Sequence, residues 1–453
     1  MPSQPRTPFY VSVVPPACIG ILLLFTFAIY RDSYFTLDDF NNLFWVNQWT
    51  YGQTLQMLFS PSAEYFRPVG MLFYRIALGL FGLKPTLFHV LLWAIHTLNV
   101  ALVYLALKRF VDSRAGAGAG ALLFACPPVF SDIFRNFGTI FEVTGFALYL
   151  TGMMLWLRKQ RSIGVVLVAT AVFFMALKAK EMALTLPAIW ILQDVLLRRQ
   201  LQWKRLLQVV IPGAVGVWFA LQKVSQMSDP SPSGPYYIDL QGLTMGRGFG
   251  FYFNMLSPVS LRWEQWAAVL AVSLLTFIVL KKWRALFFQS YVLVAFLPVI
   301  FLVNHRDYFY WYFPIFGVCG LTALVAKKTF RVVSRRMERA RLMPYAVTLF
   351  AVLCGMGYVM LRETTVNRRL GQHEFDKQYR AFVEGLQRLP SPTTGETLYF
   401  NSMPEAFDPS VLKMAVSVAL QRYDVDAQLV DEFPQHASFR LEFRNGHIRE
   451  LDR

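Results

Sequence analysis

The stretch Phe88-His-Val-Leu-Leu-Trp-Ala-Ile-His-Thr-Leu-Asn99 lies inside an apolar run over residues 85–107. Such a run crosses a bilayer as a helix, because about 20 apolar residues span the hydrocarbon. His89 and His96 are seven residues apart and therefore share one helical face. No third ligand follows at a recognisable spacing, so we expect buried, hydrogen-bonded histidines in a helix bundle and no metal site.

The composition extends this interpretation to the whole chain. Of its 453 residues, 55% are hydrophobic and 16% are charged, whereas soluble domains are about one quarter charged. The net charge of +16 would suggest nucleic acid in a soluble protein. Here the basic residues stand in short clusters between apolar runs, which is typical of membrane orientation signals. We therefore expect a polytopic membrane protein in contact with lipids, without a nucleic-acid partner.

Eleven stretches satisfy the length criterion for a membrane helix. They lie near residues 10–30, 85–107, 115–131, 138–157, 162–179, 182–197, 206–222, 263–280, 285–303, 311–326 and 343–361. The sequence thus predicts an all-α polytopic membrane domain over residues 1–361 with about 11 transmembrane helices. The four cysteines all fall in apolar segments and indicate neither disulfides nor a metal site.

Clusters of Lys and Arg fall in every second loop, which the positive-inside rule assigns to the cytoplasm. They are Lys108/Arg109/Arg114, Arg158/Lys159/Arg161, Arg198/Arg199/Lys204/Arg205, Lys281/Lys282/Arg284 and Lys327–Arg341. The opposite side then receives the first loop, Arg31–Lys84, and the C-terminus. We expect a bacterial plasma membrane, with the functional site on its periplasmic or extracellular side.

Asp38 and Asp39 follow directly on the first apolar run. Carboxylates at the exit of a span are costly and indicate a functional site; alternatively, they cap the helix that begins near Phe40. Two carboxylates can also bind a divalent cation, although two alone do not specify a site. Apolar residues mixed with polar ones after the doublet, and the stretch Pro68–Leu83, predict amphipathic interfacial helices.

Further charged residues stand at the outer ends of other spans. Lys178 and Lys180, beside Glu181, make a compact positive site suited to a phosphate at the membrane surface. The alternative is that both lysines extend along apolar surface towards water. Arg135 and Glu142 are seven residues apart, and they either pair with one another or line a polar cavity.

The turn Asn304–Tyr310 supplies another basic and aromatic group on the outer side. Arg306 can make bidentate contacts to a phosphate. Tyr308 and Tyr310 are equally well explained as part of an interfacial aromatic belt.

From about residue 362 the composition becomes that of a soluble segment. Expected strands lie at Leu398–Asn401 and Phe439–Phe443, a hairpin turn at Asn445-Gly446 and a helix within Asp408–Tyr423. The sequence predicts a small α+β domain over residues 362–453 on the non-cytoplasmic side. Its expected role is packing or acceptor recognition.

Five segments, in order, resemble landmarks of the GT-C glycosyltransferases, most closely the protein O-mannosyltransferase-like branch. They are Asp38-Asp39, Phe66-Arg-Pro-Val69, Phe88–Asn99, Ala179-Lys-Glu-Met-Ala-Leu-Thr-Leu-Pro187 and His305-Arg-Asp-Tyr-Phe-Tyr-Trp-Tyr-Phe-Pro314. The resemblance covers roughly residues 10–330. Many relatives have Asp-Glu at the doublet, and some carry tetratricopeptide repeats where this chain has an α+β tail.

The resemblance implies an inverting enzyme that moves a mannose-like sugar from a polyprenyl-phosphate donor to a protein, lipid or glycan acceptor, with no certain cofactor. Asp38 or Asp39 would be the general base for the acceptor, and Lys178, Lys180 and Arg306 would bind the donor phosphate. The residues expected to line the cleft are Arg67, His89, His96, Arg135, Glu142, Glu181, Tyr308 and Tyr310.

A transporter or flippase for a lipid-linked glycan or an anion is the rival hypothesis, because intramembrane ionisable residues also mark transport pathways. The sequence shows no paired, broken-helix repeats of the kind that many transporters contain.

The alternation of basic clusters generates a topological prediction. Single cysteines at Lys108, Arg158 and Lys281 should react with a membrane-impermeant reagent only after the cells are opened. Cysteines at Asp38 and in the C-terminal domain should react in intact cells. Labelling of Asp38 and the C-terminal domain from opposite faces would contradict the eleven-span model.

Overall fold

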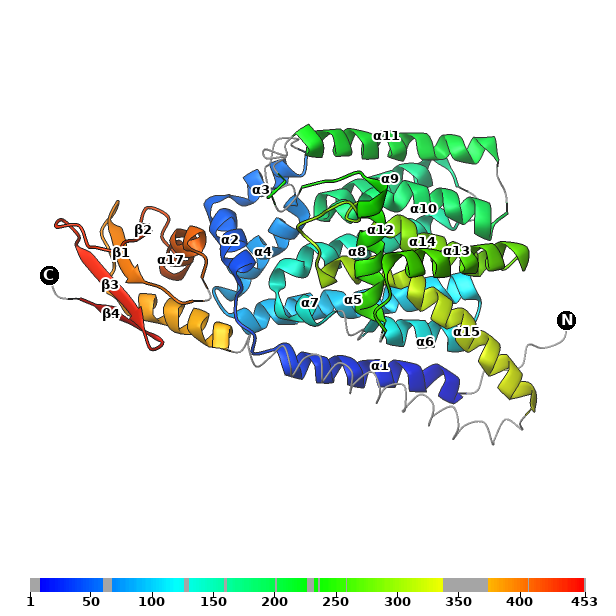
Figure 1. Ribbon diagram of the computed structural model, residues 1–453, viewed down its shortest axis with the longest axis horizontal. Coiled ribbons are helices and arrows are strands. Elements are labelled where there is room, and N and C mark those ends of the chain that lie inside the picture. Colours follow the sequence, from blue (N-terminus) through cyan, green and yellow to red (C-terminus); the bar gives the residue numbers. More distant parts are fainter. Residues whose placement is uncertain are drawn as a thin grey trace.

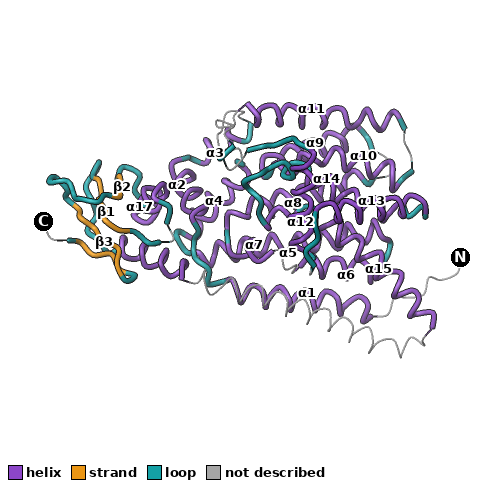
Figure 2. The backbone as a smooth tube through the Cα atoms, viewed as in Figure 1, coloured by secondary structure: helices purple, strands orange, loops and turns teal. Residues whose placement is uncertain are grey.

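A computed structural model describes residues 9–59, 67–125, 130–158, 161–199, 202–225, 232–234, 237–257, 259–336, 374–405 and 407–451 (Figure 1). It is mostly helical, with a small sheet near the C-terminus (Figure 2). The first half of the bundle contains α1 (Phe9–Tyr30), α5 (Pro85–Val111), α6 (Arg114–Ala125), α7 (Ser131–Arg135), α8 (Ile140–Trp156) and α9 (Ile163–Ala179). The second half contains α10 (Leu186–Leu192), α11 (Trp203–Ser225), α12 (Gly242–Leu256), α13 (Trp263–Val279), α14 (Trp283–Phe296) and α15 (Ile315–Arg336).

Nine of the first ten expected spans each overlap one of these helices, and the span near 182–197 is divided among three elements. The eleventh, near 343–361, lies outside the described residues. Three helices of the described part are long and apolar enough to cross a bilayer: Pro85–Val111, Phe137–Trp156 and Trp203–Lys223. The count of eleven crossings therefore stays a prediction.

The segment expected as one span near 182–197 is not a single α-helix. It begins as a 3-10 helix, η3 (Glu181–Thr185), continues as the seven residues of α10, and ends as a short π-helix, η4 (Gln193–Leu197). Pro187 stands at the start of α10. Its ring nitrogen cannot donate to the preceding turn, so the helix changes type there.

Helix α12 lies between the expected spans 206–222 and 263–280, where the sequence predicted no helix. In Figure 1 it runs across the direction of the other helices. It packs against α13 and the aromatic residues of α14, with Tyr252 stacked on Phe296 at 4.7 Å between ring centroids.

Three helices form in the first outer loop, as the amphipathic pattern predicted. They are α2 (Leu37–Gln48), α3 (Tyr51–Met57) and α4 (Pro68–Phe81). Helix α4 lies close against α8 because Gly70 leaves room for the Phe141 ring, which would overlap any Cβ at that position. The loop helices are thereby fixed to the bundle.

The C-terminal segment forms the expected α+β unit. Its sheet has the order β2-β1-β3-β4, with β1 (Thr397–Ser402) parallel to β2 (Asp426–Leu429) and β3 (Phe439–Arg444), and β4 (His447–Glu450) antiparallel to β3. Asn445 and Gly446 both have positive φ, as a two-residue hairpin turn between β3 and β4 requires. Helix α17 (Leu412–Leu420) and a helix over 374–387 complete the unit.

This unit packs against the helix that carries the aspartates. The Phe40 ring of α2 lies 6.0 Å from the Tyr379 ring and 5.7 Å from the Phe407 ring, and Phe44 lies 5.5 Å from Tyr423. Figure 1 shows α17 beside α2 at the end of the bundle. The C-terminal unit and the start of α2 thus form one packed body.

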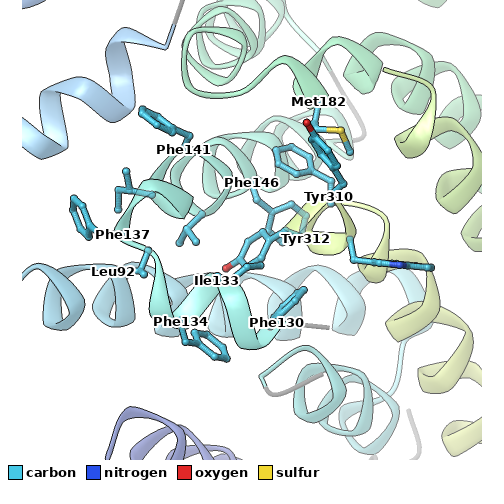
Figure 3. Close-up of a cluster of buried hydrophobic side chains, with 14 of the residues drawn as sticks. Leu92, Phe130, Ile133, Phe134, Phe137, Phe141, Phe146, Met182, Tyr310 and Tyr312 are labelled. Atoms are coloured by element: carbon cyan, nitrogen blue, oxygen red, sulfur yellow. The ribbon is translucent and has the colours of Figure 1, made fainter. Parts of the chain in front are cut away.

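Aromatic side chains fill the bundle core next to this end. Three segments contribute to this core, with Phe130 and Phe134 at α7, Phe146 in α8 and Tyr312 near α15, and Figure 3 shows their rings gathered in one cluster. Tyr312 stacks on Phe130 with ring centroids 4.8 Å apart. Packed rings of this kind change conformation little, so they hold the neighbouring polar groups in place.

The contacts of Phe40 generate a prediction about the C-terminal unit. Phe40→Ala should destabilise the protein by about 3–5 kcal/mol, because a fully buried ring is removed from a tight cluster. Hydrogen exchange within 374–451 should rise at the same time. Phe44→Ala, which removes a less buried ring from the same face of α2, should have a smaller effect; equal exchange in wild type and Phe40→Ala would contradict the assigned contact.

Candidate active site

The two aspartates of the doublet have different environments. Asp39 is fully buried: its carboxylate accepts hydrogen bonds from the Thr36 backbone N–H at 2.8 Å and the Tyr74 hydroxyl at 2.5 Å. Burial raises its pKa to about 6, against the opposing effect of these hydrogen bonds. Asp38 is exposed. Asp39 therefore caps the start of the helix, which was the alternative interpretation of the doublet, whereas Asp38 is accessible to a reactant.

Asn136 holds Asp38 in place, and the sequence analysis did not select it. Its side-chain N–H donates to the Asp38 carboxylate at 3.2 Å. Its side-chain oxygen accepts from the Gly138 backbone N–H at 2.7 Å, which fixes the amide orientation. The signal in the sequence was weak, because Asn136 precedes the expected span and is nearly a hundred residues from the aspartates.

Lys180 and Glu142 form an ion pair inside the bundle, with side chains 3% and 4% exposed. The alternative that Arg135 pairs with Glu142 is therefore wrong. The carboxylate of Glu142 is held by a lysine from the break between α9 and η3, and Gly145, one turn along α8, leaves room for the Lys180 side chain. Burial lowers the pKa of Lys180, and the nearby charge of Arg67 lowers it further.

A second group of charges lies beside this pair. Arg67 Nε lies 3.1 Å from Glu181 Oε1, and Lys223, at the end of α11, lies 3.2 Å from the same oxygen. Burial alone would raise the pKa of Glu181, but the charges of Arg67 and Lys223 hold it well below its usual range. Lys223 was not a candidate, although it is the only basic residue directly after the expected span 206–222.

His305 lies beside the group of cations. Its ring centroid is 5.9 Å from that of Phe309 and 5.6 Å from that of Tyr310, and these two rings also lie over the Lys180 ammonium. Burial lowers the pKa of His305, and Asp307, whose carboxylate lies 3.1 Å from Nδ1, opposes this. His305 and Lys180 therefore contact the same pair of aromatic rings.

The segment that carries His305 is anchored in the bundle by Tyr312. The Tyr312 hydroxyl lies 2.7 Å from His96 Nδ1 and accepts from the Asn99 amide at 3.0 Å. His96 Nε2 lies 3.1 Å from the Ala125 carbonyl oxygen. His96 is thus buried and hydrogen-bonded, as expected, and it positions the 3-10 helix η5 (Tyr308–Tyr312).

Aromatic rings of that helix cover the Lys180 ammonium. Its nitrogen lies 5.2 Å from the Phe309 ring centroid and 5.4 Å from the Tyr310 centroid. Tyr310 is buried, and Figure 3 shows it on the side of the aromatic cluster nearer Met182. Tyr310 therefore contributes to the site and not to an exposed interfacial belt, while Tyr308 beside it is half-buried.

Two other predicted cations lie over aromatic rings. The ammonium of Lys178 lies 5.5 Å from the Phe174 ring, and the guanidinium of Arg306 lies 5.9 Å from the Phe251 ring of α12. Arg306 also donates to the Leu302 carbonyl at 3.0 Å. Lys180 instead pairs with Glu142, and Arg67 pairs with Glu181.

His89 is buried within α5, and Arg135 is the last residue of α7. These two helices pack against one another. Phe66, the first residue of the Phe66–Val69 landmark, lies outside the described residues.

This arrangement can take up a proton and bind an anion. Asp38 is an exposed carboxylate held in position by a hydrogen bond, as a general base must be. Arg67, Lys180 and Lys223 offer three positive charges against the two carboxylates of Glu142 and Glu181. Within the part of the chain that the structure describes, no group of three or more His, Cys, Asp or Glu could hold a metal ion.

The sequence matches no protein-family model and no curated protein sequence. Among solved structures, the fold is similar to that of ArnT from Cupriavidus metallidurans bound to undecaprenyl phosphate, with a TM-score of 0.54 and 14% identity over 93% of this chain and 86% of that chain. Apo ArnT gives a TM-score of 0.51 and 15% identity, over 91% and 85% of the two chains. The archaeal oligosaccharyltransferase AglB from Archaeoglobus fulgidus, in complex with an inhibitory peptide and a dolichol-phosphate, gives 0.49 and 11%, over 93% and 65%.

At these identities the likeness to ArnT concerns the fold alone. It does not single out the O-mannosyltransferase-like branch.

The ion pair of Lys180 and Glu142 generates a prediction about stability. Glu142→Gln should destabilise the protein by about 3–5 kcal/mol, because it leaves a buried ammonium without its counter-charge. Lys180→Gln should cost a similar amount, and the double variant should cost much less than the sum. Thermal unfolding in detergent measures this coupling, and strictly additive losses would exclude the pair.

Proposed function

We propose that the protein is a membrane glycosyltransferase that moves a sugar from a polyprenyl-phosphate donor to a protein, lipid or glycan acceptor. The observation that carries the proposal is the short series of contacts between the doublet and the cations: Tyr74 donates to Asp39, the Tyr74 ring lies 6.1 Å from the Phe141 ring, and the Arg67 guanidinium lies 5.5 Å from the Phe141 centroid. A base and an anion site around one region are what this transfer needs. The fold similarity to ArnT bound to undecaprenyl phosphate supports the choice of a lipid phosphate.

The proposed reaction is a single displacement. The acceptor hydroxyl oxygen attacks the anomeric carbon of the sugar while its proton passes to the Asp38 carboxylate. The bond from the anomeric carbon to the phosphate oxygen breaks, and its electron pair leaves with the polyprenyl phosphate. One displacement inverts the anomeric configuration, and the base contributes about two to four orders of magnitude in rate.

The cations stabilise the charge that develops on the departing phosphate. Three of them, Arg67, Lys180 and Lys223, stand against two carboxylates, so one positive charge remains for the phosphate. The carboxylates hold the cations in fixed positions before the reaction begins, which avoids reorganisation in the transition state.

The finer assignments follow the GT-C resemblance and the alternation of basic clusters. We propose a mannose-like sugar, a bacterial plasma membrane with about eleven crossings, and a reaction on its non-cytoplasmic side. The small C-terminal unit packs on α2, which begins with Asp38 and Asp39. We assign it to acceptor recognition or to support of that helix.

The different environments of the doublet generate a prediction about turnover. Asp38→Asn should reduce transfer by about 10²-fold or more and leave the unfolding temperature nearly unchanged, because Asp38 is exposed. Asp39→Ala should behave in the opposite way, losing about 1–3 kcal/mol of stability but little turnover per folded molecule. The measurement is release of polyprenyl phosphate from a lipid-linked mannose by the purified protein.

Wild-type turnover in Asp38→Asn would exclude this base. The same assay in detergent separates the enzyme from the transporter, since detergent leaves no compartments. Movement of substrate across sealed vesicles without sugar transfer in detergent would replace the proposal by the transporter hypothesis.

The assignment of the phosphate site generates a further prediction. Lys180→Ala and Arg67→Ala should each weaken transfer strongly, and their effects should be non-additive because the two cations act on one phosphate. Lys178→Ala and Arg306→Ala are the comparison variants, because these cations lie over the rings of Phe174 and Phe251. A larger loss in either comparison variant than in Lys180→Ala would move the phosphate to that residue.

A further inference from the structure

Two of the basic clusters interpreted above as orientation signals, Arg158/Lys159/Arg161 and Arg198/Arg199/Lys204/Arg205, contribute arginines to one buried carboxylate. Asp194 of η4 is 3% exposed, and three arginines from three segments surround it. Arg161 Nη2 lies 2.8 Å from Oδ2, Arg198 Nε 3.7 Å from Oδ1, and Arg205 Nη1 3.9 Å from Oδ1. We call these four residues the Asp194 cluster.

The Asp194 cluster carries more positive than negative charge. Three guanidinium groups face one carboxylate, and within the described part of the chain no other acidic side chain pairs with them. The arginines also act on one another: burial lowers the pKa of Arg198, and the charge of Arg161 lowers it further. A second anion would relieve this repulsion.

Two donors of the cluster have no acceptor. Arg161 Nη1 and Arg205 Nη1 are both shielded from solvent, and neither makes a hydrogen bond to the described residues. The Arg161 side chain is only 2% exposed. Most buried polar groups in proteins are hydrogen-bonded. Two such donors in one cluster therefore indicate a site for a ligand. Guanidinium groups match the oxygens of a phosphate.

The cluster is rigid before any ligand binds. Trp156 and Trp190 stack with ring centroids 4.4 Å apart, and the Arg161 guanidinium lies 4.2 Å from the Trp156 ring centroid. The Trp156 indole N–H donates to Asp194 Oδ2 at 3.2 Å. A π-helix such as η4 is uncommon and frequently occurs at functional sites.

The neighbouring surface is apolar. Figure 1 shows α11 alongside α9 and α10, and several of its side chains next to Arg205 are exposed. They are Trp203, Leu207, Val210 and Ile211. The site also lies far from the candidate active site: Arg161 precedes α9 and Lys180 follows it, and a helix of 17 residues is about 25 Å long.

We propose that the Asp194 cluster binds the phosphate of an anionic lipid headgroup, whose acyl chains lie along the exposed apolar face of α11. Basic pockets between membrane helices recognise such headgroups. The site is separate from the region around Asp38, so it does not depend on the proposed transfer reaction.

The test uses the full-length protein, freed of co-purified lipid, in detergent. Native mass spectrometry titrates it with phosphatidic acid, with phosphatidylcholine of the same acyl chains, and with inorganic phosphate. Arg205→Gln removes one guanidinium whose described polar contact is with Asp194 alone. Lys204→Gln is the matched control, because it makes the same charge change at the adjacent exposed residue. Arg205→Lys keeps the charge but loses the planar fork.

Wild type should bind phosphatidic acid at least about tenfold more tightly than phosphatidylcholine. Arg205→Gln should weaken phosphatidic acid binding at least about tenfold, Arg205→Lys by less, and Lys204→Gln hardly at all. If inorganic phosphate competes with phosphatidic acid, the site recognises the phosphate group. If inorganic phosphate binds as tightly as phosphatidic acid, a lipid is not the ligand and the proposal is overturned. Equal loss in Arg205→Gln and Lys204→Gln, no preference over phosphatidylcholine, or no binding by wild type would overturn the site.

Discussion

The buried ion pair of Lys180 and Glu142 constrains the arrangement of the site more than any other contact. An ammonium group inside a helix bundle must keep its counter-charge, so α8 and the break after α9 cannot move apart without a large cost. The rings of Phe309 and Tyr310 then close over the same ammonium. Any movement of η5 would therefore expose a charge that the bundle has already desolvated.

The residues around this pair divide into buried groups that support the fold and more exposed groups that can react. Asp39, His96 and Asn99 are buried and hydrogen-bonded, and each fixes an element that carries a more exposed group. Asp39 closes the start of α2 and thereby sets the position of Asp38. His96 and Asn99 hold Tyr312, which sets the position of His305. Hydrogen bonds to buried polar groups such as these rigidify the elements that carry them.

The two ends of the bundle use arginine differently. At the end near Asp38, Arg67 is matched by Glu181, and the excess positive charge is small. At the other end, three arginines share Asp194. From the sequence, the arginines at both ends look alike, as charges in loops. The hydropathy pattern does not show which of them lie around one carboxylate. Only the packing of η4 against the neighbouring loops assembles the Asp194 cluster.

The sequence by itself determined the mostly helical class, the positions of nine of the expected apolar helices and the strands around Asn445-Gly446. These depend on local periodicity and turn chemistry. The tertiary structure decided which aspartate is exposed, that Glu142 pairs with Lys180 and not with Arg135, and that Asn136, Lys223 and His305 join the site. These outcomes depend on contacts between residues far apart in the chain. The position of a residue along a helix determines the face on which it lies. The partner that it meets on that face belongs to another segment of the chain.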